Sequence, residues 1–221
     1  MKEMPNRISA VILAGGRSSR MGSCKAELPW EGKTLIEHQV EKMRRLGIND
    51  IMISGYPVQI EGTRFIPDKY PLKGPLSGIH AGLLAAKNSH CLVTGIDTPL
   101  VPVDVLSELI NKHISTSANI SVLSHGDKIE PTIGVYESWL AAIAEQILVT
   151  DDTSVRKLLN KVGYSKYLFT GDEFLLCDCN TPEEFEQARA KATQTTYSQF
   201  EKASHDFSCE AQRCKKFLHA K

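Results

Sequence analysis

The sequence lacks a long apolar run. No stretch of the 221-residue chain approaches about eighteen consecutive apolar residues, the minimum that usually spans a membrane as a helix. The N-terminal segment MKEMPNR has no apolar core of the kind found in signal peptides. We therefore expect a cytoplasmic protein with no membrane partner.

The sequence also lacks an excess of charge of either sign. It contains 26 Lys plus Arg and 26 Asp plus Glu, which gives a formal net charge of +0. An extended nucleic-acid-binding surface usually leaves a basic excess. We expect no nucleic-acid partner, although a local basic site remains compatible with this balance.

The six cysteines do not form a familiar metal motif. Cys177 and Cys179 are too close together for a CxxC knuckle, and in the cytoplasm all six thiols are expected to be reduced. Cys91 lies in an apolar run and is expected to fill the core. Cys209 and Cys214 have flanking histidines, but their spacing does not favour a zinc site.

The first half of the chain alternates between short apolar strands and helices of about ten residues. This rhythm is typical of right-handed crossovers in a mainly parallel sheet whose two faces are both covered. We predict an α/β fold with three layers, α/β/α, and a Rossmann-like sheet. The expected strands are Ile8–Leu13, Ile48–Ser54, Cys91–Ile96 and Ile120–Leu123, and the expected helices are Thr34–Leu46, Ser77–Ala86 and Val103–His113.

The second half is less regular, and the end of the chain differs from the rest. We predict a strand at Pro131–Tyr136, helices at Ser138–Leu148 and Thr153–Val162, a late strand at Phe174–Asp178, and a helix with Thr181 as cap and Pro182 in first position. Residues 1–192 should form one domain. Residues 193–221 are polar and should be an extension that is helical or loosely packed, or that mediates oligomer contacts.

A glycine-rich loop follows the first predicted strand directly. It begins Leu13-Ala14-Gly15-Gly16 and continues to Arg20 and Lys25. Ligands of open α/β sheets bind at this position, where backbone N–H groups can cradle phosphates and cationic side chains add donors. The spacing matches neither a P-loop nor a G-x-G-x-x-G dinucleotide fingerprint.

A single acid ends the third predicted strand. Asp97 should face the same crevice as the glycine loop, because both follow strands at the carboxyl edge of a parallel sheet. A carboxylate there can hold Mg²⁺, which prefers oxygen ligands and substrate phosphates. Without the loop, Asp97 would be read as a turn residue before Pro99.

These motifs, in this order, resemble the molybdenum cofactor guanylyltransferases, within the nucleotidyltransferases of Rossmann-like fold. The resemblance covers about residues 7 to 190. Beyond the glycine loop, the matching segments are Lys33–His38, Asp68 with Gly74–Ile79, Gly95–Pro99, Glu130–Thr132 and Asn180–Glu183.

The resemblance implies transfer of GMP from GTP to the phosphate of molybdopterin, with release of pyrophosphate and Mg²⁺ as cofactor. Lys25, Arg20 and Asp97 would be catalytic, with Asp97 as the metal ligand. The loop from Leu13 to Gly16, together with Lys25, Ser54, Asp68 and Asp97, would bind the nucleotide, and Glu130 and Asn180 would bind the acceptor. Asp68 would accept from the guanine N1–H and N2–H₂ donors. Ser54 departs from the family, which often has Asn there.

Two other functions are compatible with the sequence. A cytidylyl or other nucleotidyl transferase could use the same scaffold, although relatives that use CTP usually carry Leu-Ala-Ala-Gly instead of Leu-Ala-Gly-Gly. A non-catalytic nucleotide-binding adaptor could dock partners through residues 193–221. The expected assembly is a monomer or weak homo-oligomer, with molybdoenzyme maturation proteins as candidate partners.

Overall fold

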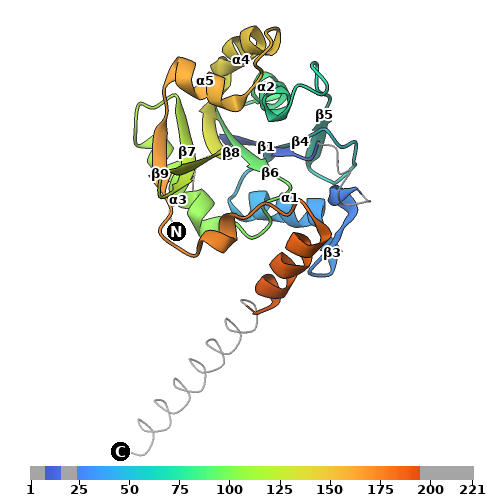
Figure 1. The fold of residues 1–221 in the computed structure, drawn as a ribbon. Coiled ribbons are helices and arrows are strands. Elements are labelled where there is room, and N and C mark those ends of the chain that lie inside the picture. Colours follow the sequence, from blue (N-terminus) through green and yellow to red (C-terminus); the bar gives the residue numbers. More distant parts are fainter. Residues whose placement is uncertain (1–7, 16–23, 195–221) are drawn as a thin grey trace, which may run out of the picture.

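The structure is a computed structural model, and it describes residues 8–15 and 24–194. A seven-stranded sheet forms the centre of the molecule, in the order β5-β4-β1-β6-β8-β7-β9 (Figure 1). Its strands are β1 Ile8–Leu13, β4 Asp50–Ser54, β5 Thr63–Ile66, β6 His90–Gly95, β7 Ile120–His125, β8 Lys128–Glu137 and β9 Ser165–Leu168.

Most neighbouring strands are parallel. β1 pairs in parallel with β4 and β6, β4 pairs in parallel with β5, and β7 pairs in parallel with β9. β8 is the exception, since it lies antiparallel between β6 and β7. The predicted mainly parallel sheet is therefore confirmed.

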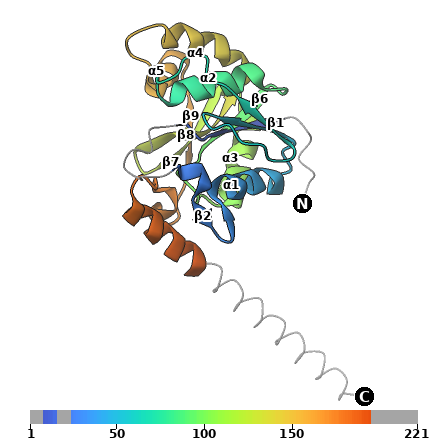
Figure 2. The ribbon, with the colours of Figure 1, turned by 90° about the vertical axis from the view of Figure 1, so that its right-hand side faces the viewer.

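Helices cover both faces of the sheet, which gives the three layers predicted from the sequence (Figures 1 and 2). Helices α1 (Leu35–Arg45) and α3 (Val103–Ile114) lie on one face, and α2 (Pro75–Ala85), α4 (Ala141–Leu148) and α5 (Val155–Val162) lie on the other. Alternate residues of β1 serve the two layers, with Ile12 in one apolar cluster and Val11 in the other. Both faces of the sheet are thus buried under apolar side chains, which accounts for the continuous apolar runs in the sequence.

Side-chain caps begin several helices where the sequence predicted. Thr34 accepts from the backbone N–H of Glu37, whose side chain accepts in return from the Thr34 backbone N–H, so α1 starts with a capping box. Thr181 caps the helix at 182–194 in the same way, because its hydroxyl accepts from the Glu184 N–H at 3.2 Å. Phe185 of this helix packs against the buried ring of Trp30, with ring centroids 5.6 Å apart.

Two glycines let α2 pack directly on the sheet. A Cβ at Gly78 would lie 2.8 Å from both Leu13 Cδ2 and Ser54 Oγ. A Cβ at Gly82 would lie 2.7 Å from Val11 Cβ and Cγ1. Real Cβ atoms almost never approach other atoms this closely, so the spacing between α2 and the ends of β1 and β4 depends on glycine.

The predicted late strand at Phe174–Asp178 is wrong. The structure has a 3-10 helix at Glu173–Leu176, called η3, followed by extended residues without a strand partner. The Asp172 carboxylate accepts from the Phe174 N–H at 3.0 Å and begins this turn, which buries Leu176. Cys177 is exposed and Cys179 is buried, so the two thiols do not share a strand face.

Several short elements were not predicted. They include the edge strands β5 and β9, the 3-10 helices η1 (Lys25–Glu27) and η2 (Ser138–Leu140), and a two-stranded pair of β2 (Pro29–Trp30) with β3 (Lys33–Thr34). η2 occupies the first turn of the helix expected at Ser138–Leu148.

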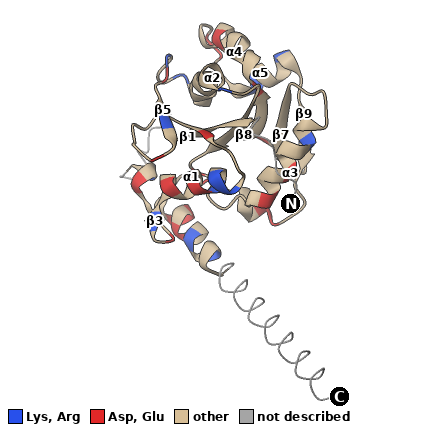
Figure 3. Ribbon diagram, turned by 180° about the vertical axis from the view of Figure 1, so that it is seen from behind, with Lys and Arg blue, Asp and Glu red and all other residues tan. Residues whose placement is uncertain are grey.

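Basic and acidic residues are interspersed over the described elements (Figure 3). Within residues 8–15 and 24–194, no helix is both long and apolar enough to cross a bilayer. Cys91 is fully buried among apolar residues, as expected for core filling. The cysteines predicted to be free in the tail, Cys209 and Cys214, lie outside the described residues.

Candidate active site

The candidate site begins where three parallel strands end side by side. Leu13 of β1 pairs with Ser54 of β4 and with Gly95 of β6, so the loops that follow these strands leave from one edge of the sheet. The Ala14 N–H donates to the Ser54 carbonyl at 2.8 Å, and the Ile96 N–H donates to the Leu13 carbonyl at 3.0 Å. The carboxyl edge predicted from the sequence is therefore one continuous, hydrogen-bonded surface.

Two glycines meet just beyond this edge. Gly55 has a positive φ of 82°, and a Cβ there would lie 2.3 Å from Gly15 Cα. A Cβ at Gly15 would in turn lie 3.1 Å from Gly55 Cα. The glycine loop therefore presses its backbone against the turn after β4, and side chains would push the two apart.

Lys25 and Asp97, which the sequence assigned to one cleft, lie next to each other. Lys25 Nζ is 4.0 Å from Asp97 Oδ2, with side chains 13% and 33% exposed. The same ammonium group donates to Asn180 Oδ1 at 2.8 Å. Residues that are distant in the sequence thus surround one partly buried cation.

Helix α1 holds the turn that carries Asp97. The Gln39 side-chain amide donates to the Gly95 carbonyl at 3.0 Å, and Lys42 Nζ donates to the Pro99 carbonyl at 3.1 Å. Gly95 leaves room for the carboxylate, because a Cβ there would lie 2.3 Å from Asp97 Oδ1. Helix α1 therefore holds the backbone of residues 95–99, and the Asp97 side chain lies beside Lys25 at the end of the glycine loop.

The chain after η3 adds a second carboxylate that the sequence reasoning missed. The Cys179 N–H donates to the Asp97 carbonyl at 2.8 Å, which brings Asp178 beside Asp97. Burial of its carboxyl group, with the charges of Asp97 and Glu130, raises the pKa of Asp178 to about 6, although the residue as a whole is exposed. The Glu130 carboxylate lies 2.7 Å from Lys128 Nζ.

Among the described residues of the site, three carboxylates, Asp97, Asp178 and Glu130, lie near two cations, Lys25 and Lys128. Carboxylates that crowd together disfavour their own ionisation unless a cation joins them. Asp97 and Asp178 are oxygen donors of the type that Mg²⁺ binds, so these residues fit a divalent cation.

Asp68 and Ser54 form a separate pair at the other end of the site. The Ser54 hydroxyl donates to Asp68 Oδ1 at 2.5 Å, and Ser54 is only 2% exposed. Gly78 of α2 lies against this hydroxyl. Ser54, which departs from the family pattern, thus orients the Asp68 carboxylate, which is expected to bind the base. Gly16 and Arg20 lie outside the described residues.

Comparisons with known proteins show the family of the chain. A family model described as a MobA-like NTP transferase domain matches residues 10–166. The chain is 30% identical over 188 residues to a probable molybdenum cofactor guanylyltransferase of Carboxydothermus hydrogenoformans, covering 81% of this chain and 94% of the relative. It is 30% identical over 214 residues to the molybdenum cofactor guanylyltransferase of Syntrophotalea carbinolica, covering 93% and 98%.

The fold is also shared with solved structures. Molybdopterin-guanine dinucleotide biosynthesis protein A of Archaeoglobus fulgidus superposes with a TM-score of 0.73 at 24% identity, covering 84% of this chain and 99% of that one. At this identity the likeness concerns the fold alone. It agrees with the α/β architecture described above.

Proposed function

Because this chain belongs to the MobA-like NTP transferase domain family, we propose that it transfers GMP from GTP to the phosphate of a molybdopterin-type acceptor. The relatives of Carboxydothermus and Syntrophotalea, which align over most of the chain, carry the name of this activity. The observation that carries the proposal is the approach of Lys25 to Asp97, 4.0 Å apart, at the carboxyl edge of the sheet.

The proposed reaction is a direct displacement at phosphorus. An oxygen of the acceptor phosphate attacks the α-phosphorus of GTP, the bond from that phosphorus to the bridging oxygen of the β-phosphate breaks, and pyrophosphate leaves with the electron pair. The acceptor phosphate is already anionic near neutral pH, so the step needs no strong general base. Catalysis then depends on positioning and on charge neutralisation.

Lys25 would neutralise the triphosphate. Its ammonium group is held between Asp97 and Asn180, which directs it into the site before a nucleotide binds. Arg20 is proposed from the sequence to add a second positive charge. The Ala14 N–H already donates to Ser54, so we assign the backbone contact with phosphate to Gly15 and Gly16, with Leu13 and Ala14 shaping the loop.

Asp97, with Asp178 beside it, would hold Mg²⁺. The bound ion would supply positive charge to the phosphates of GTP, and the two carboxylates are the oxygen ligands that it requires. Burial and the neighbouring charges of Asp97 and Glu130 raise the pKa of Asp178 to about 6, and a cation bound here would offset both effects. The charge of Glu130 acts on Asp178, and Asn180 accepts from Lys25. Both residues are proposed to face the acceptor.

Asp68 would select the base. A carboxylate can accept hydrogen bonds from both N1–H and N2–H₂ of guanine, whereas cytosine does not offer this donor pair. The Ser54 hydroxyl, at 2.5 Å, fixes one carboxylate oxygen and leaves the other for the base. This arrangement favours guanylyl over cytidylyl transfer, the alternative on the same scaffold.

A pyrophosphate-release assay tests the proposal. Purified full-length protein is incubated with Mg²⁺, a molybdopterin acceptor, and GTP, CTP, ATP or UTP in turn. We expect acceptor-dependent release with GTP and a much lower kcat/KM with the other three. Preferred use of CTP would reject guanylyl transfer, and nucleotide binding without release would favour the non-catalytic adaptor.

We also propose a cytoplasmic protein that is a monomer or weak homo-oligomer. Residues 1–192 would carry the activity, and residues 193–221 would dock molybdoenzyme maturation proteins. Removal of the tail tests this division. Unchanged activity with lost complex formation would support it, whereas unchanged complex formation would contradict it.

A further inference from the structure

A second group of potential metal ligands lies at the opposite edge of the sheet from Asp97. His90 begins β6, Glu137 ends β8, and these two residues pair across the antiparallel ladder. His113 lies in the last turn of α3. The three side chains therefore come from three elements that the fold brings together at one point.

The distances between these side chains are close to those of a coordination shell. His90 Nδ1 lies 2.9 Å from Glu137 Oε1, and His113 Nε2 lies 3.5 Å from the same oxygen. All three ligand atoms lie within 4.8 Å of one another. Two ligands on a tetrahedral zinc ion, with bonds of about 2.0–2.1 Å, are about 3.3 Å apart. Small side-chain shifts would bring all three onto one ion.

The two imidazole nitrogens that face the carboxylate are buried. Within residues 8–15 and 24–194, His90 Nδ1 and His113 Nε2 approach the Glu137 carboxylate at 2.9 Å and 3.5 Å, but neither contact has the geometry of a hydrogen bond. The His113 side chain is only 1% exposed, while His90 and Glu137 are 25% and 19% exposed. Burial without a hydrogen bond is costly for a polar atom. The partial exposure of His90 and Glu137 gives an ion access from solvent.

The surroundings of His113 allow the tautomer that binds a metal through Nε2. Its Nδ1 lies 2.9 Å from Ser121 Oγ, which lies 2.9 Å from Ser165 Oγ. If Nδ1–H donates to Ser121, and Ser121 donates to Ser165, the lone pair of Nε2 points toward Glu137. Histidine ligands in metal sites are commonly oriented by a hydrogen bond of this kind from their second nitrogen.

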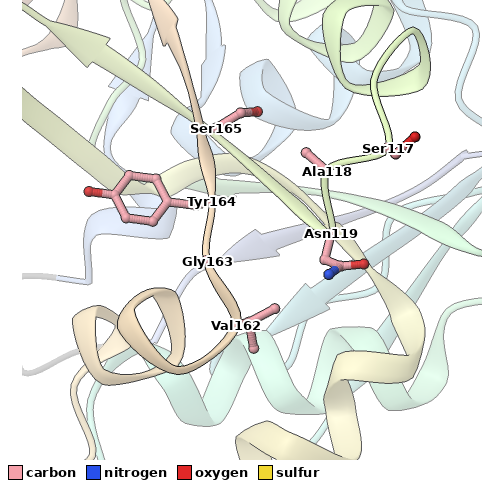
Figure 4. Close-up of a pocket in the computed structure, with 7 residues that line it drawn as sticks. All are labelled: Ser117, Ala118, Asn119, Val162, Gly163, Tyr164 and Ser165. Atoms are coloured by element: carbon pink, nitrogen blue, oxygen red, sulfur yellow. The ribbon is translucent and has the colours of Figure 1, made fainter.

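The backbone around the cluster is also held in place. The Glu137 N–H donates to the Asn119 carbonyl at 3.0 Å, and the Ser138 N–H donates to the Ser89 carbonyl at 2.7 Å. A surface hollow of about 240 Å³ is lined by residues 117–119 and 162–165, among them Asn119, whose carbonyl accepts from the Glu137 N–H, and Ser165, whose hydroxyl contacts Ser121. Figure 4 shows these two segments facing one another, with Asn119 and Ser165 both on the lining. The hollow leaves solvent space next to Ser165, whose hydroxyl contacts Ser121, the hydrogen-bond partner of His113.

We propose that His90, His113 and Glu137 bind one zinc ion. Zinc commonly takes two imidazoles and one carboxylate, with a water in the fourth position. A simple ion-pair cluster explains the geometry less well, because the two rings lie 5.3 Å apart edge to face and would share one carboxylate. The bound ion would join β6, β8 and α3 and stabilise the edge of the sheet remote from the nucleotide site.

The test measures zinc binding to the full chain. The parent protein carries Cys209→Ser and Cys214→Ser, which removes two tail thiols that could bind zinc, and excess Mg²⁺ is present to occupy oxygen-rich sites. Calorimetric titration should give a stoichiometry of one zinc ion per chain. Thermal unfolding should show a higher melting temperature for the zinc-bound protein than for the zinc-free protein. Cobalt substitution should give the intense visible absorption of a four-coordinate site.

Two ligand variants and one matched control decide the result. Glu137→Gln and His90→Ala alter partly exposed ligands, and each should weaken zinc binding by more than about 100-fold, beyond the usual loss from a supporting residue. His125→Ala removes a histidine 3.9 Å from Glu173, a simple pair, and should bind zinc as the parent does. An unchanged affinity in both ligand variants, or no stoichiometric binding by the parent, would overturn the proposal.

Discussion

Replacing Gly78 by Ala should damage both stability and nucleotide binding, whereas Gly82→Ala should damage stability alone. Both glycines lie on the face of α2 that contacts the sheet, and the added Cβ would approach its neighbours to 2.8 Å in one case and 2.7 Å in the other. Overpacking of this kind costs about 1–3 kcal/mol. The higher helix propensity of Ala offsets up to about 1 kcal/mol of this loss in both variants. Urea unfolding should therefore show similar losses.

The two variants differ in what the new methyl group displaces. At position 78 it meets the Ser54 hydroxyl, which donates to Asp68 at 2.5 Å. At position 82 the three nearest atoms all belong to Val11. A hydrogen bond to a charged group contributes about 1.5–3 kcal/mol. If misplacing Asp68 loses a comparable amount toward guanine, the KM for GTP should rise about 10- to 100-fold in Gly78→Ala only.

The assay is pyrophosphate release at varied GTP concentration, with both variants measured below their unfolding transitions. Ser54→Ala provides an independent check, because it removes the hydroxyl without adding volume to α2. Equal KM values in Gly78→Ala and Gly82→Ala would refute the link between α2 packing and the base-reading carboxylate.

Three further perturbations test other parts of the structure. Lys25→Ala and Asp97→Ala should each lower kcat by about 10²–10³-fold with an unchanged circular dichroism spectrum, because each removes charge that the transferring phosphate needs; near-wild-type turnover would contradict the assignment. Asp68→Asn should lower the ratio of kcat/KM for GTP over CTP, and an unchanged ratio would show that the base is read elsewhere. Burial, with some contribution from Arg45, lowers the pKa of Lys42 from 10.5 to about 7. The unfolded chain then binds one more proton than the folded chain between these values, so stability should rise with pH across this window. Urea unfolding should show that Lys42→Met loses this rise; equal slopes in both proteins would contradict it.

The order of the main elements could be predicted because their patterns are strong and local. The run Ile8–Leu13 matches β1 at both ends, and Thr34 and Thr181 cap helices where the sequence placed them. The approach of Lys25 to Asp97 also followed from topology, because loops after neighbouring parallel strands leave from one edge. Their assignment as catalytic groups remains a prediction.

The missed features depend on contacts between distant residues. β9 is a short edge strand with alternating half-exposed side chains, so it lacks a strong apolar signal. The segment at η3 resembles a strand in sequence because Phe174, Leu175 and Leu176 form a short apolar run, but the Asp172 cap begins a 3-10 helix there. Asp178 enters the site only through the backbone bond from Cys179 to Asp97, and no local pattern reveals such a contact.

A crystal structure of the full-length protein with GTP and Mg²⁺ tests the central claim most directly. We predict one nucleotide across the ends of β1, β4 and β6, with its triphosphate between Gly15 and Lys25, Mg²⁺ on Asp97, and the guanine edge on Asp68. A nucleotide bound away from this edge, or a triphosphate that contacts neither Lys25 nor an Asp97-bound metal, would contradict the account.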